Sequence, residues 1–167
     1  MILKIYTSIH VLISLLGIFS GFVVLFELLA GKRLNDWTAL FLTTTVATSA
    51  TGFFFPVHHF MPSHAVGIIS LVVLALAIYA RYARGLAGVW GKIYVVGAVM
   101  ALYLNVFVAI VQAFLKIPAL KAMAPTQTEP PFKLTQLVVL ALFVLLTVVA
   151  AIKFRREQIN RVPAEVN

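Results

Sequence analysis

The stretch LTQLVVLALFVLLTVVAAI, which covers residues 134–152, contains no charged side chain. A helix needs about 20 predominantly apolar residues to cross the hydrocarbon core of a bilayer, so this stretch is long enough to span a membrane. Three further stretches are similarly apolar, at roughly 5–30, 65–81 and 93–115. The sequence therefore predicts an all-α integral membrane protein.

A fifth segment, at 37–56, is less apolar because it contains many threonines and serines. Their hydroxyl groups bond back to carbonyls of their own helix, so they are tolerated in membrane helices and favoured between them. We therefore predict a single membrane domain, residues 1–167, built as a bundle of five transmembrane helices. An outer loop at 116–133 joins the last two spans, and a charged cytoplasmic tail at 153–167 follows the fifth.

The composition supports the membrane class and excludes several others. The chain is 62% hydrophobic and 11% charged, with a mean hydropathy of +1.05, whereas soluble domains are about 45–50% apolar and about 25% charged. The net charge of +8 comes from basic residues between apolar runs, which indicates contact with lipid headgroups and no nucleic-acid partner. The chain has no cysteine, which excludes disulfides, iron–sulfur clusters, thiolate nucleophiles and c-type haem attachment.

The basic residues also predict an orientation, because lysine and arginine are enriched in cytoplasmic loops. With five spans, the connections alternate between the two sides of the membrane. One side receives Lys32, Arg33, Arg81, Arg84, Lys92, Lys153, Arg155, Arg156 and Arg161, and the other receives Lys4, Lys116, Lys121 and Lys133. We therefore expect an outer N-terminus and a cytoplasmic C-terminus, in a multi-pass protein of a bacterial inner membrane.

The same arrangement gathers the histidines at one edge of the membrane. The chain contains His10, His58, His59 and His64, and five spans place all four at the outer edge. His10 shares a helix face with Ser14, Gly17 and Gly21, and such small residues let another helix approach closely. We therefore expect His10 to point into the bundle.

Two polar residues of other spans are expected beside His10. Thr51 ends a threonine stripe in the second span, and Gln112 lies near the outer end of the fourth. Polar groups in hydrocarbon are costly unless paired, so these residues either join helices by hydrogen bonds or line a site. The predicted cofactor-binding residues are His10, His58, His59, His64, Gln112 and Thr51.

Three cofactor chemistries suit these residues. Paired imidazoles are the usual axial ligands of a membrane b-type haem, which is our first choice. His10, His59 and His64 together suit copper or zinc, with Met61 as a soft ligand for copper. A histidine beside a glutamine or threonine also suits a quinone carbonyl. The spacing matches no established ligand motif, so the cofactor stays open.

The outer loop contains APTQTEPPF, residues 124–132, with Glu129 as the only acid on that side. Its prolines stiffen the segment, and Pro130 favours an extended Glu129. The loop is expected to act either as a lid, in which Glu129 orients an imidazole, or as a rigid connector or docking surface.

Several stretches resemble a family of small, uncharacterised bacterial inner-membrane proteins. They are TALFLTTTVATSATGFFFP, PSHAVGIISLVVLALAIYARYAR, YLNVFVAIVQAFLKIPAL and APTQTEPPF. The resemblance covers most of the chain and implies a polytopic membrane protein, but no activity and no site residues.

Three functions follow from these observations. The first is a membrane binding or redox module, active in electron transfer, that uses the histidine edge. The second is an accessory or assembly subunit of a larger membrane complex, or a homo-oligomer, in which the polar stripes only pack helices. The third is a small transporter. The sequence contains no recognisable nucleophile–base pair, so it assigns no catalytic residues and leaves open whether the protein is an enzyme.

Overall fold

The computed structural model describes residues 1–32, 35–56 and 62–161; for residues 62 and 157–161 it describes the backbone alone. Within these ranges the chain is helical and has no strand. The elements are α1 (Ile2–Leu29), α2 (Asn35–Thr51), the 3-10 turn η1 (Gly52–Phe54), α3 (Pro62–Ile78), the π-helical turn η2 (Tyr79–Ala83), α4 (Val89–Lys116), α5 (Pro118–Met123) and α6 (Pro130–Arg161).

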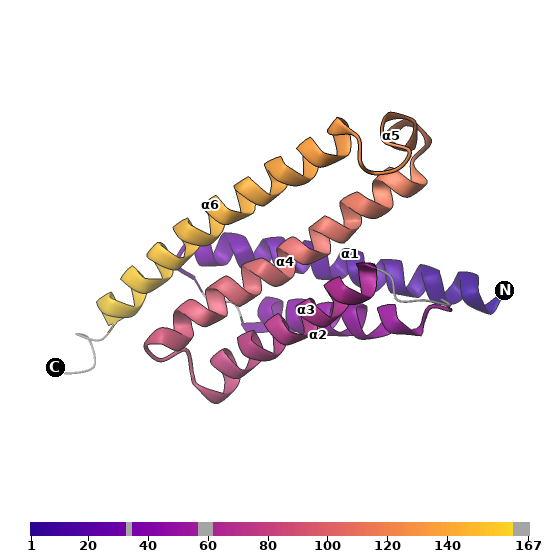
Figure 1. Cartoon of the computed structure of the whole chain (residues 1–167). Helices are drawn as coiled ribbons and strands as arrows, with labels where there is room; N and C mark the ends of the chain where they lie inside the picture. The colour runs from indigo at the N-terminus through magenta and orange to yellow at the C-terminus, as the bar shows by residue number, and fades with distance from the viewer. Residues whose placement is uncertain (33–34, 57–61, 162–167) are drawn as a thin grey trace.

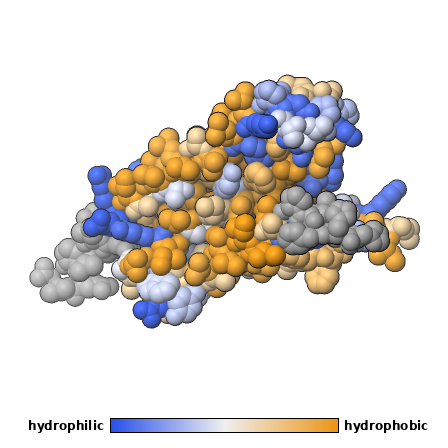
Figure 2. All heavy atoms as spheres, viewed as in Figure 1, coloured by the Kyte–Doolittle hydropathy of each residue, from blue (hydrophilic) through white to orange (hydrophobic). Residues whose placement is uncertain are grey.

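The described helices identify a membrane protein. Four are long and apolar enough to cross a bilayer: Ile2–Leu29, Ser63–Ala83, Val89–Lys116 and Pro130–Arg156. Their outward faces stay apolar, since Phe26 is 64% exposed and Val138 is 65% exposed. Figure 2 shows this apolar surface, with hydrophilic atoms gathered toward the two ends of the molecule. Soluble monomers rarely expose continuous apolar patches of this extent.

The four strongly apolar stretches are confirmed as helices, and each helix is longer than the predicted span when α3 is counted together with η2. α2 covers most of the expected fifth span at 37–56 but is not one of the four membrane-length helices. It ends at Thr51, and after η1 the backbone of Phe55 is extended, with φ −69° and ψ 136°. Pro56 explains this ending, because a residue before proline is driven out of the helical conformation.

The region expected as the outer loop, 116–133, is partly helical. It contains α5, and α6 begins within it at Pro130. Pro118 is the first residue of α5, a position where the missing proline N–H leaves no hydrogen bond unmade. The expected tail, 153–167, also starts as a helix, because α6 continues to Arg161.

The five long helices lie along one another and alternate in direction (Figure 1). α1 packs against α2, α4 and α6, while α3 packs against α2 and α4, and α4 against α6. We call the end that holds Met1, residues 52–56 and α5 the histidine end. The end that holds Gly31, residues 84–88 and Lys153 is called the basic end.

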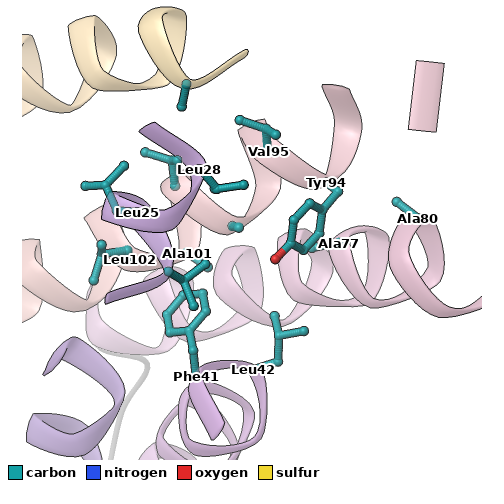
Figure 3. Close-up of a cluster of buried hydrophobic side chains, with 14 of the residues drawn as sticks. Leu25, Leu28, Phe41, Leu42, Ala77, Ala80, Tyr94, Val95, Ala101 and Leu102 are labelled. Atoms are coloured by element: carbon teal, nitrogen blue, oxygen red, sulfur yellow. The ribbon is translucent and has the colours of Figure 1, made fainter. Parts of the chain in front are cut away.

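The core lies where α1, α2 and α4 meet. A Cβ atom added to Gly21 of α1 would lie 2.6 Å from Leu102 Cδ1 and 2.8 Å from Phe41 Cε2, so only a glycine allows this approach. Figure 3 shows Phe41 of α2 facing Ala101 and Leu102 of α4 in the buried cluster. This contact fixes the axial position of α1 relative to α2, and therefore the level at which their side chains meet at the histidine end.

Candidate functional site

His10 and Thr51 form the centre of the histidine end. His10 Nδ1 lies 2.9 Å from the Oγ1 atom of Thr51, which is the last residue of α2. The Thr51 hydroxyl also donates a hydrogen bond of 2.6 Å to the carbonyl oxygen of Ala47, one turn earlier. The contact joins α1 to α2 close to the point where α2 ends, and His10 is half-buried there.

These two hydrogen bonds fix the tautomer of the neutral imidazole. A hydroxyl group has one proton, and the Thr51 proton is used in the bond to Ala47. The Thr51 oxygen therefore accepts a hydrogen bond from Nδ1–H of His10. The Nε2 atom of neutral His10 then carries the lone pair, and it is the atom able to accept a proton or to bind a metal ion.

Aromatic rings surround this pair. The Phe55 ring contacts His10 edge to face, with a centroid distance of 5.0 Å. Tyr6 packs against the same Phe55 ring at 5.0 Å, and its hydroxyl donates a hydrogen bond of 2.6 Å to the Thr51 carbonyl oxygen. Because α2 ends at Thr51, Tyr6 supplies a donor to one of the last carbonyls of the helix.

His64 lies on another side of the aromatic segment formed by residues 53–55. It is in the first turn of α3 and stacks on the Phe53 ring, with centroids 5.6 Å apart and an interplanar angle of 21°. A Cβ atom on Gly67 would lie 3.1 Å from that ring, so the glycine keeps room for it. His10 and His64 thus pack against two different rings, Phe55 and Phe53, of one short segment.

The remaining predicted site residues have different positions. His58 and His59 lie outside the described residues, as does Met61. Gln112 is exposed on α4, and its predicted place beside His10 stays a prediction. The last turns of α4 diverge from α1 and α2 (Figure 1).

Two other amides occupy the interior. Asn105 Nδ2 of α4 donates a hydrogen bond of 3.1 Å to Thr45 Oγ1 of α2. Gln136 of α6 is buried and donates one of 3.2 Å to the carbonyl oxygen of Phe107. Gln136 was not among the predicted site residues, because it lies in the most apolar stretch of the chain.

Hydroxyl groups continue the polar contacts along α2. Ser14 Oγ donates to the His10 carbonyl oxygen at 2.7 Å and lies 3.4 Å from Thr48 Oγ1. On the other side of α2, Ser49 Oγ donates to Ser70 Oγ of α3 at 3.0 Å. The threonine-rich segment therefore makes the interhelical hydrogen bonds that its composition predicts.

The Glu129 carboxylate is bound within its own loop. It accepts hydrogen bonds from the Thr126 hydroxyl at 2.8 Å, from the Thr126 N–H at 3.1 Å and from the Thr128 N–H at 3.0 Å. Burial raises the pKa of the Glu129 carboxyl, but these bonds and the residue's own N–H outweigh burial and hold the pKa below its usual value. This geometry matches the rigid connector rather than a group that orients an imidazole.

The described residues contain no group of three or more His, Cys, Asp or Glu side chains that could hold a metal ion. A haem held by two imidazoles, or a quinone bonded to one, needs fewer such side chains than this. Sequence reasoning also missed the roles of Tyr6 and Phe55. Tyr6 could have been found, because it lies one helical turn before His10 on the same face of α1.

The chain matches no family model, no curated protein and no solved structure. Its resemblance to a bacterial inner-membrane family therefore stays a prediction.

Proposed function

We propose that the chain is an integral membrane binding module that holds a redox cofactor at its histidine end, with His10 as the central residue. The observation that supports this best is the hydrogen bond between His10 Nδ1 and Thr51 Oγ1. Histidines that bind metals are commonly held in this way, with the second ring nitrogen bonded to the protein. The arrangement leaves the Nε2 lone pair of His10 for a ligand.

A b-type haem is the first candidate cofactor. It needs two imidazole ligands, often from different helices, and no cysteine. His10 of α1 is proposed as one ligand, and His64 of α3 or His59 as the other. Copper or zinc held by His10, His59 and His64 is an alternative cofactor, and a quinone needs only the His10 Nε2 as a partner for its carbonyl.

The proposal includes a membrane orientation. The five long helices alternate in direction (Figure 1), and the basic residues divide unequally between the two ends. Both observations support five crossings of a bacterial inner membrane, with the histidine end outside and the C-terminus in the cytoplasm. The cofactor would then exchange electrons or protons with the outer aqueous phase.

The visible spectrum of the purified full-length chain, together with metal analysis and quinone extraction, tests this proposal. We expect a Soret band that shifts on reduction with dithionite, and its loss in a His10→Ala variant. Lys121→Gln is the matched control, because Lys121 is exposed at the same end of the molecule, is no candidate ligand, and its loss should leave the band unchanged. A chain that carries no haem, no stoichiometric metal and no quinone would overturn the proposal.

A second candidate is an accessory subunit of a larger membrane complex. It is favoured by the mutual satisfaction of the polar groups between helices, as in the Asn105–Thr45 and Ser49–Ser70 pairs. Such pairs hold helices together without any ligand. Purification in a gentle detergent separates the two candidates: an accessory subunit co-purifies with its complex in stoichiometric amounts, and His10→Ala and His64→Ala leave that association intact.

A further inference from the structure

A cavity of about 220 Å³ opens at the basic end, far from the histidines along the bundle. It lies between the end of α1 and the last turns of α6, and its lining includes Leu29, Ala30, Gly31, Lys153 and Arg156. Both cations come from α6, and both are exposed. Because they are three residues apart on one helix, they lie on the same face and point toward the same space.

The positive charge of this cavity exceeds what the neighbouring helix end can neutralise. The C-terminus of α1 carries only about half a unit of negative charge from its backbone dipole. Lys153 and Arg156 bring two full positive charges, and no acidic side chain is among the described lining residues. Glu27, the only acid of α1, is buried one turn before the cavity and does not line it. The surplus charge suits a phosphate group.

The position of the cavity indicates where that phosphate comes from. Lys153 directly follows the charge-free stretch 134–152, and Gly31 follows the apolar helix α1. Both walls therefore lie where apolar surface gives way to charge, which is the level of lipid headgroups. On the apolar side, Phe26 is 64% exposed and Ile152 is 49% exposed, so acyl chains have surface to lie on.

We propose that this cavity binds the phosphate of an anionic phospholipid, with Lys153 and Arg156 as its ligands and the acyl chains along α1 and α6. Basic pockets between membrane helices are a recurrent way to hold such headgroups. The proposal does not depend on a cofactor at the histidine end, and it holds for either orientation of the chain.

Native mass spectrometry of the full chain in mixed micelles of phosphatidylcholine and phosphatidylglycerol measures this binding. We expect retained phosphatidylglycerol, with affinity falling about fivefold in Lys153→Gln or Arg156→Gln and about thirtyfold in the double variant, from the usual contribution of one basic residue near an anionic surface. The charge-conserving variant Lys153→Arg/Arg156→Lys should bind like the native chain, which shows that the fold tolerates changes at these positions.

The matched control is Arg155→Gln/Lys92→Gln, which removes the same charge from exposed residues that do not line the cavity. It should retain the lipid. Equal loss of lipid in this control would mean that general surface charge holds the lipid, which would overturn the proposal. Full retention of the lipid by the Lys153→Gln/Arg156→Gln variant would mean that the cavity does not bind it. Addition of inorganic phosphate should leave the lipid bound; displacement by it at comparable concentration would identify free phosphate as the ligand and overturn the lipid assignment.

Discussion

The Thr51 hydroxyl takes part in two hydrogen bonds at once. It donates to Ala47 and accepts from His10, and in this way it ties the end of α2 to α1. Valine has nearly the same shape but no oxygen, so it would leave Nδ1–H of His10 without its acceptor. An unsatisfied, partly buried donor costs about 1–3 kcal/mol.

We therefore predict that Thr51→Val lowers the free energy of unfolding by about 1–3 kcal/mol, measured by thermal or denaturant unfolding in detergent. Thr51→Ser should behave like the native chain, because it keeps the oxygen. Thr43→Val is the control, since Thr43 is exposed on the same helix and should change stability by no more than about 0.5 kcal/mol. Equal stability of the Thr51→Val and Thr43→Val variants would contradict the role of this hydroxyl.

Glu129 makes stability depend on pH in a defined direction. Its pKa is lower in the folded chain than its usual value, so the folded state binds protons less readily than the unfolded state. Its contribution is fully present above the unfolded pKa of about 4.3 and is lost as the pH falls through the lower folded value. Protease cleavage within residues 124–129, followed from pH 7 to pH 3, should therefore accelerate at acidic pH.

The variant Glu129→Gln isolates this effect, because glutamine has no acidic proton to lose. Its cleavage rate should be higher than that of the native chain at neutral pH, and the difference between the two chains should shrink as the pH falls. A constant difference across this range would show that the carboxylate charge does not hold the loop.

Sequence spacing predicts part of the site at this scale. The four- and three-residue spacing after His10 correctly identifies the face of α1 that meets α2, because both residues lie in regular helices. The contacts of Phe53 and Phe55 could not be predicted, since helical spacing rules fail where α2 gives way to a 3-10 turn and an extended residue.

At the scale of elements, glycine sets the distance between α1, α2 and α4. Phe41 is fully buried and Leu102 is 1% exposed, so neither side chain has free space into which it can withdraw from Gly21. A methyl group at this position would overlap both of them. This steric cost exceeds the gain of about 1 kcal/mol that alanine brings to a helix over glycine.

We predict that Gly21→Ala destabilises the bundle, with an overpacking cost of about 1–3 kcal/mol, measured by thermal unfolding in detergent. Gly17→Ala is the comparison, because its Cβ would lie 3.3 Å from Thr44 Oγ1 and needs only a small shift. Gly17→Ala should therefore unfold at a higher temperature than Gly21→Ala. The reverse order would mean that the contact around Gly21 relaxes easily.

Composition predicts the strongly apolar helices well, because charge-free stretches of this length have few alternatives to a membrane helix. The boundaries were less predictable. α5 was missed because it is short and lies among prolines, and a proline favours the first turn of a helix as readily as a turn. The π-helical turn at Tyr79–Ala83 has no recognisable pattern in the sequence.

At the scale of the whole molecule, the two ends should lie on opposite sides of a membrane. The chain has no cysteine, so single-cysteine variants can be labelled without background. We predict that Lys4→Cys and Lys121→Cys react with an impermeant maleimide from outside intact cells. Arg84→Cys and Lys153→Cys should react only after the membrane is opened.

Cysteines at Lys32 and Pro56, which flank α2, decide whether that helix crosses the bilayer. They should label from opposite sides if it does, with Lys32→Cys protected in intact cells. Labelling of Lys4→Cys and Lys153→Cys from the same side would show an even number of crossings and would contradict the placement of the two ends on opposite sides of the membrane.

The hydroxyl groups of α2 have a consequence for biogenesis. Their partners belong to α1, α3 and α4: Thr48 meets Ser14, Ser49 meets Ser70, and Thr45 accepts from an amide 60 residues later in the chain. A nascent α2 leaving the ribosome therefore lacks most of these partners and gains little from entering lipid alone. We expect the translocon to retain it beside α1 until α4 has been synthesised. In a chain truncated after residue 90, a cysteine placed at Ala50 of α2 should therefore react with an aqueous maleimide, while in a chain truncated after residue 116 it should be protected.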